Sequence, residues 1–222
     1  MSLPPDLLEI TLRSLWVAGL GTLLALGPAL AFGALFARRR FAGRLVLRTL
    51  LLLPMVLPPV AVGLVLLRAS GPRWPFGAWL ASLGFDVVLT LRGAVLAAAV
   101  MCFPLVLLGA ERGFAAVPTR LEQLAATLGT SRARIWLRVT LPLALPGILY
   151  GAVFGFARCL GEFGATVLVA GIVPGRTETL STAVYAAIER FDHGAAMAYA
   201  AVSIALAAIL VFSAERLLER AR

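Results

Sequence analysis

The sequence predicts an all-α membrane protein, a bundle of about five transmembrane helices with the N-terminus outside and the C-terminus inside. Of its 222 residues, 61% are hydrophobic and 14% are charged, against about 45–50% and about 25% in soluble domains. The mean hydropathy is +0.96. A globular core of this size cannot bury such an excess, so lipid is the expected solvent. The length suits a single domain over residues 1–222.

Five segments free of charge are long enough to cross a bilayer, which takes about 20 apolar residues in a helix. The first, third and fourth are rich in glycine and alanine, which permit close helix contact in lipid. A further apolar run at 74–85 is short and is expected to be re-entrant or interfacial, anchored by tryptophan. The five segments are 14–37, 49–67, 93–110, 139–157 and 195–214.

Two of these segments are expected to be interrupted. The second carries Pro54, Pro58 and Pro59, and proline inside a helix removes backbone hydrogen bonds and bends it. A packing kink and a place in a transport pathway explain these prolines equally well. The fourth segment continues through Arg158 and Glu162 as far as residue 175, which is too long for one straight crossing at about 1.5 Å per residue. A break is therefore expected at 161–164.

The distribution of arginine predicts the orientation. All twenty basic residues are arginine, and thirteen of them lie in the loop 38–48, the segment 111–138 and the tail 215–222. Six lie on the opposite side, and Arg158 lies within the membrane. The positive-inside rule puts the first group in the cytoplasm. The net charge of +9 is thereby explained without nucleic acid, which would require a polar basic face.

The amino-acid composition argues against a catalytic or metal-binding role for this chain. There is no lysine, so a phosphate-binding loop of the Walker type is absent. One histidine, His193, and two cysteines in apolar runs, Cys102 and Cys159, leave little for a metal site or a nucleophile. The sequence therefore predicts no catalytic residue and no metal site, which argues against a membrane-embedded enzyme.

The segment 111–138 between the third and fourth spans is the most informative part of the chain, because long loops in compact bundles are usually functional. Leu121, Leu124 and Leu128 recur at helical spacing. Gly129 follows as a helix end, and Ser131 is placed to cap a second helix. Two interpretations stay open: a helix that lies on the membrane surface, and a ridge that docks in a groove of a soluble partner.

The end of this segment resembles a motif of ABC importer permeases. Gly129, nine further residues, Val139, one residue and Leu141-Pro142 are similar to the G-x9-I-x-L-P half of that family's EAA loop. The family's Glu-Ala-Ala triplet would fall on positions 123–125, where only Ala125 matches and Glu122 is displaced by one.

The resemblance continues along nearly the whole chain and is closest to molybdate permeases, with sulfate permeases as relatives. The similar stretches are the proline-rich run 53–60, the run 92–101 from Arg92 to Met101, the Gly-Glu-Phe-Gly-Ala-Thr run at 161–166, and Ile-Val-Pro-Gly at 172–175. The resemblance implies an ATP-driven importer that moves molybdate or tungstate into the cytoplasm by alternating access.

Partners and location follow from the same resemblance. It implies a second copy of this chain, two ATPase subunits that bind ATP and magnesium, and an extracytoplasmic oxyanion-binding protein, in the lipid of the bacterial cytoplasmic (inner) membrane. No cofactor is then expected in this chain. The loop at about 111–142 would couple to the ATPase through Leu121, Glu122, Gln123, Leu124, Ala125, Leu128, Gly129, Thr130, Ser131, Ile135, Leu141 and Pro142.

Arg158 and Glu162 are ionisable residues within the membrane, where such residues usually face the interior or water. Arg158 either faces an anion pathway or pairs with Glu162 four residues on. We take as pathway or gate candidates Pro58, Pro59, Arg158, Gly161, Glu162, Phe163, Gly164 and Thr166.

Two alternatives to a molybdate importer remain at this stage. One is an ABC permease of the sulfate or thiosulfate type. The other is an ion-coupled secondary transporter, which should show internal repeats and a polar cluster at the midplane, and the sequence shows no repeat.

Overall fold

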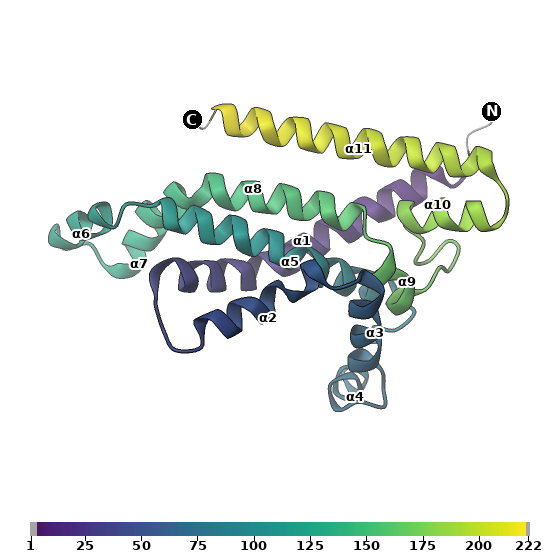
Figure 1. Cartoon of the computed structure of the whole chain (residues 1–222), viewed down its shortest axis with the longest axis horizontal. Coiled ribbons are helices and arrows are strands. Elements are labelled where there is room, and N and C mark those ends of the chain that lie inside the picture. The colour runs from purple at the N-terminus through teal and green to yellow at the C-terminus, as the bar shows by residue number, and fades with distance from the viewer. Residues whose placement is uncertain (1–3, 221–222) are drawn as a thin grey trace.

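The computed structural model describes residues 4–220, and all regular structure within that range is helical (Figure 1). The predicted arginine-bearing tail lies partly beyond it, because positions 221–222 are outside the described residues. The helices are α1 Leu7–Arg38, α2 Arg44–Val56, α3 Pro59–Ser70, α4 Pro75–Ser82, α5 Leu91–Ala116, α6 Thr119–Thr127, α7 Arg132–Ile135, a π-helical turn Trp136–Thr140, α8 Leu141–Leu160, α9 Gly164–Ala170, α10 Leu180–Glu189 and α11 His193–Arg220.

The prediction of about five membrane crossings is confirmed. Four helical runs are long and apolar enough to cross a bilayer: α1, α5, the continuous run Arg132–Leu160, and α11 from His193 to Arg216. The bent pair formed by α2 and α3 is long and apolar enough together to make a fifth. The third long run begins earlier than predicted, because α7 passes through the π-helical turn into α8 without a break.

The second crossing differs from the single bent helix that its prolines suggested, since it is two helices that meet at 112°. Leu57 ends α2 with extended backbone, Pro58 precedes the next helix, and Pro59 is its first residue. A proline disfavours helical backbone at the residue before it and is itself well suited to the first turn of a helix. Pro54 lies inside α2 without ending it.

The core of the bundle lies among α1, α5 and α8. Buried residues recur along one face of α1 (Val17, Ala18, Ala25, Ala29 and Phe36) and pack on Ala94, Ala98, Cys102 and Val106 of α5. A second cluster joins α3, α5 and α9, and a third joins α1, α10 and α11. Most of these side chains are small, so the helix axes lie close together.

The contact between α5 and α8 brings two helix backbones together. A Cβ atom added to Gly109 or Gly113 would collide with the backbone of α8, and one added to Gly147 or Gly151 would collide with α5. Contact of two helix backbones through small residues is the usual way for membrane helices to associate. The predicted packing role of these glycines is therefore confirmed for α5 and α8.

The two ends of the bundle are built differently (Figure 1). One end carries the turn between α1 and α2 together with α6 and α7. The other carries α3, α4, α9 and α10, and there the backbone N–H of Leu180 donates to Ser14 Oγ at 2.7 Å. The short helix α4 exposes Trp74, which precedes it, and Trp79, as expected of an interfacial element.

Candidate functional site

The predicted coupling segment is a pair of short helices at the arginine-rich end of the bundle (Figure 1). Helix α6 ends at Thr127, and the backbone of Gly129 has φ +74, a left-handed conformation that glycine adopts without strain. Ser131 occupies the N-cap position of α7, although its side chain makes no capping hydrogen bond. The structure therefore has the helix, glycine turn and helix that the spacing predicted.

Most of the predicted coupling residues lie at the surface. Leu121, Leu124 and Leu128 are 41%, 51% and 84% exposed, so α6 presents apolar side chains that nothing in the chain covers. Ile135 is different, since it is buried and holds α7 against the bundle. The exposed members also include Gln123, Gly129, Ser131 and Pro142, while Glu122, Ala125, Thr130 and Leu141 are half-buried.

Glu122 ties α6 to the rest of the bundle. One carboxylate oxygen, Oε1, accepts from Arg38 Nη2 at 2.8 Å and from Thr140 Oγ1 at 2.6 Å. Arg38 is the last residue of α1, and Thr140 lies at the start of α8. Sequence reasoning missed Arg38 and Thr140 as partners, because Arg38 is 84 positions from Glu122 in the chain and no local pattern connects them.

The predicted break in the fourth segment is confirmed. Helix α8 ends at Leu160, Gly161 is its C-cap, and α9 begins at Gly164. Glu162 lies in this break and is 2% exposed. Its Oε1 accepts from the backbone N–H of Ala165 at 2.9 Å, so the carboxylate satisfies one of the free N–H groups at the start of α9.

Arg158 pairs with Glu162, as one of the two sequence interpretations held. Nη1 of Arg158 lies 2.7 Å from Oε2 of Glu162, and the side chains are 32% and 1% exposed. The backbone carbonyl of Glu162 also accepts from Ser181 Oγ at 2.6 Å. Glu162 thus connects the end of α8 and the start of α9 through its carboxylate, and the start of α10 through its backbone carbonyl.

The structure brings together the two groups of gate candidates. An added Cβ at Gly164 would lie 3.0 Å from Cβ of Pro59, so the start of α3 packs on the start of α9. Thr166 is buried in α9, and the ring of Phe163 lies 5.0 Å from that of Tyr185 on α10. Pro58 is exposed beside this contact. The proline break and the glycine break therefore form one site, although about a hundred residues separate them.

The site combines a buried ion pair with packed helix ends. Within residues 4–220, no group of three or more His, Cys, Asp and Glu side chains could hold a metal ion. Both cysteines are buried and free.

Comparison with known proteins places this geometry in context. Residues 29–222 match the profile of the family described as "Binding-protein-dependent transport system inner membrane component". The chain is 43% identical to the molybdenum transport system permease protein ModB of Escherichia coli (strain K12), over 93% of this chain and 91% of that protein. It is 39% identical to ModB of Mycobacterium tuberculosis over 90% and 75%.

A sulfate transport relative and two solved structures extend the comparison. The sulfate transport system permease protein CysT of E. coli (strain K12) is 34% identical over 85% of this chain and 70% of that protein. A chain of the MetNI methionine ABC transporter in an inward-facing conformation has a TM-score of 0.74 at 16% identity, with full coverage of both chains. A chain of an amino acid ABC transporter has a TM-score of 0.64 over 99% and 100%.

Proposed function

Because the chain belongs to the family of binding-protein-dependent transport system inner membrane components, we propose that it is the membrane permease of an ATP-driven importer for molybdate. The family and the apolar helices make it a multi-pass protein of the cytoplasmic (inner) membrane. The assignment of molybdate as the substrate rests on the sequence identity, which is 43% with a molybdenum permease and 34% with a sulfate permease.

A permease of this family works with other subunits rather than as an enzyme. ATP and its magnesium bind to separate ATPase subunits, which agrees with the lack of lysine in this chain. An extracytoplasmic oxyanion-binding protein delivers the substrate. This division of labour favours an importer over the ion-coupled secondary transporter.

The segment α6–α7 is the contact with the ATPase. Its exposed leucines offer an apolar ridge, the form of helix that docks into a groove, and it lies on the arginine-rich, cytoplasmic side. Glu122 binds Arg38 of α1 and Thr140 next to α8. A displacement of α6 is therefore passed to two membrane helices, which supports its role in coupling.

Two copies of the chain form the translocation pathway. Helix α2 has no buried residue, and Met197, Ile204 and Ile209 of α11 are 64%, 69% and 61% exposed, so one copy leaves much of its membrane surface uncovered. The packed breaks at Pro58–Pro59 and at 161–166 are the gate. Helix breaks at membrane depth are tolerated where they are buried in protein or line a cavity, and alternating access would open and close them.

The decisive experiment is uptake by proteoliposomes that hold this chain with its ATPase and binding protein. We expect uptake of labelled molybdate that requires ATP and that excess tungstate or molybdate suppresses more strongly than sulfate does. Sulfate as the stronger competitor would assign the chain to the sulfate type. Uptake that follows an ion gradient without ATP would contradict the importer.

A further inference from the structure

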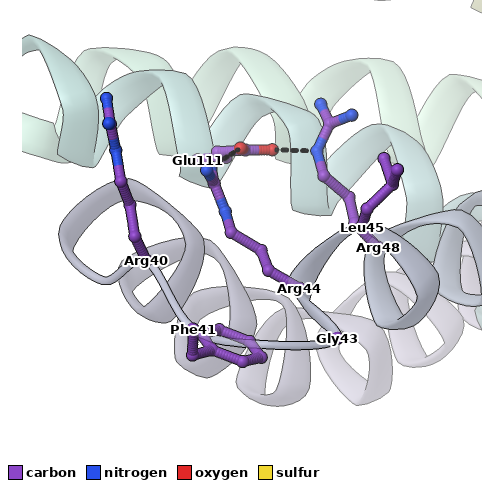
Figure 2. A pocket seen from close by; sticks show the side chains of 7 residues that line it. All are labelled: Arg40, Phe41, Gly43, Arg44, Leu45, Arg48 and Glu111. Atoms are coloured by element: carbon purple, nitrogen blue, oxygen red, sulfur yellow. Dashed lines mark hydrogen bonds and ion pairs between the residues drawn. The ribbon is translucent and has the colours of Figure 1, made fainter.

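A basic cavity lies between the turn after α1 and the cytoplasmic end of α5. It has a volume of about 630 Å³ and is lined by Arg40, Phe41, Gly43, Arg44, Leu45, Arg48 and Glu111. Three guanidinium groups meet one carboxylate, so two positive charges are not balanced within the lining. Figure 2 shows the arginine side chains extending toward α5, with Glu111 among them.

The contacts in this cavity leave donors free. Glu111 accepts from Arg48 Nε at 3.1 Å and lies 3.5 Å from Arg44 Nη2, which also donates to the backbone carbonyl of Phe36 at 2.9 Å. Within residues 4–220, Arg40 forms no ion pair or hydrogen bond, and the buried Nε of Arg44 has no partner. Helix α2 also begins here, at Arg44, and the N-terminus of a helix favours an anion. The site is therefore suited to a phosphate group.

A second cavity, with an apolar lining, lies farther along α2 and α5. Its volume is about 380 Å³, and its lining is apolar throughout, with residues from α1, α2 and α5: Leu24, Ala25, Pro28, Leu50, Leu51, Pro54, Leu96, Ala99, Val100 and Phe103. Leu51 follows Arg48 by one helical turn, a rise of about 5 Å. Both cavities lie between α2 and α5.

We propose that the two cavities bind one anionic phospholipid of the cytoplasmic leaflet. Its phosphate lies on Arg40, Arg44 and Arg48, and an acyl chain lies in the apolar cavity beside Leu51. The cytoplasmic leaflet is rich in anionic lipid, and basic pockets between membrane helices on that side suit its headgroups. A free phosphate would satisfy the arginines but would leave the apolar cavity unused, so the lipid accounts for both.

The test is binding of lipid to the purified full-length chain in detergent, followed by native mass spectrometry. We expect dioleoylphosphatidylglycerol to bind more tightly than dioleoylphosphatidylcholine, which has the same acyl chains and no net charge. Arg40→Gln should weaken phosphatidylglycerol binding roughly fivefold, and Arg40→Gln with Arg48→Gln roughly 25-fold. Binding of phosphatidylcholine should not change. Because Arg40 has no partner to lose, its variant should fold normally.

Arg39→Gln is the matched control, since Arg39 is exposed in the same turn but does not line the cavity. An equal loss in Arg39→Gln, or no loss in the Arg40 and Arg48 variants, would overturn the site. Displacement of the lipid by millimolar inorganic phosphate would identify a free anion as the ligand. Equal affinity for a six-carbon-chain phosphatidylglycerol would overturn the acyl-chain cavity. None of these readouts depends on transport.

Discussion

Among single residues, Glu162 shows how this chain keeps a carboxylate inside apolar surroundings. One oxygen accepts from the backbone of α9, and the other lies beside Arg158. A buried charge without a partner is strongly destabilising. Compensation of the Glu162 charge is therefore enough to explain the ion pair. Arg158 then has a structural role, whether or not it also meets the transported anion.

Removal of the Arg158 charge separates these two roles. We expect Arg158→Gln to lower the free energy of unfolding by about 1–2 kcal/mol, less than for a fully buried pair because Arg158 is partly exposed. The double variant Arg158→Gln with Glu162→Gln should recover much of that stability, because the orphaned carboxylate is removed too. Thermal unfolding in detergent measures both.

Transport by the double variant tests whether Arg158 has a role in the transport pathway besides its ion pair with Glu162. If Arg158 serves only its partner, ATP-dependent uptake should return together with stability. A double variant that is stable yet does not take up molybdate would show that the pair serves transport as well as folding.

At the scale of elements, the turn at Gly129 is open on all sides. Its φ of +74 disfavours other residues, but an added Cβ would meet no atom within 4 Å. Gly129→Ala therefore introduces only backbone strain of about 1–2 kcal/mol, and Gly129→Asn introduces less. Since no atom of the chain lies near the Cβ position, we expect any further effect of a larger side chain to arise at a surface outside the chain.

Three variants at this position test the coupling role. We expect Gly129→Asn to transport nearly normally and Gly129→Ala to lose part of its activity. Gly129→Trp should insert in the membrane but lose both ATPase binding and uptake. Pull-down of the ATPase and proteoliposome uptake measure the two effects. Equal transport by the Trp and Ala variants would contradict docking at α6–α7.

Local sequence patterns predicted the helices better than they predicted the contacts between helices. Arginine counts, apolar runs and the glycine at 129 predicted the spans, their orientation and the helix pair α6–α7, because each depends on neighbours in sequence. The 112° bend between α2 and α3 exceeded the predicted kink, since two successive prolines end one helix and begin another. The contact of Pro59 with Gly164 and the tie from Glu122 to Arg38 depend on tertiary packing, which no local pattern encodes.

For the whole molecule, the structure makes the predicted orientation testable with the chain's own chemistry. The natural cysteines, Cys102 and Cys159, are 0% and 5% exposed, so they should react little with maleimides. Ser131 and Ser82 are exposed at the two ends of the bundle. Each can be replaced by cysteine without loss of a buried group.

The orientation predicts opposite labelling of these two variants. In intact spheroplasts, a membrane-impermeant maleimide should label Ser82→Cys but should reach Ser131→Cys only after permeabilisation. The unsubstituted chain gives the background. The reverse pattern would place α6–α7 outside the cell, where no ATPase could reach it.

The glycine contact between α5 and α8 has a mechanical consequence for α6–α7. The segment α6–α7 connects α5 to α8 in the chain. The backbones of α5 and α8 are in contact at Gly109, Gly113, Gly147 and Gly151. Close backbone contact at several points along both helices favours movement of α5 and α8 as one unit. We therefore expect a displacement at the cytoplasmic end to reach the far end of α8, where Glu162 accepts from the backbone of α9.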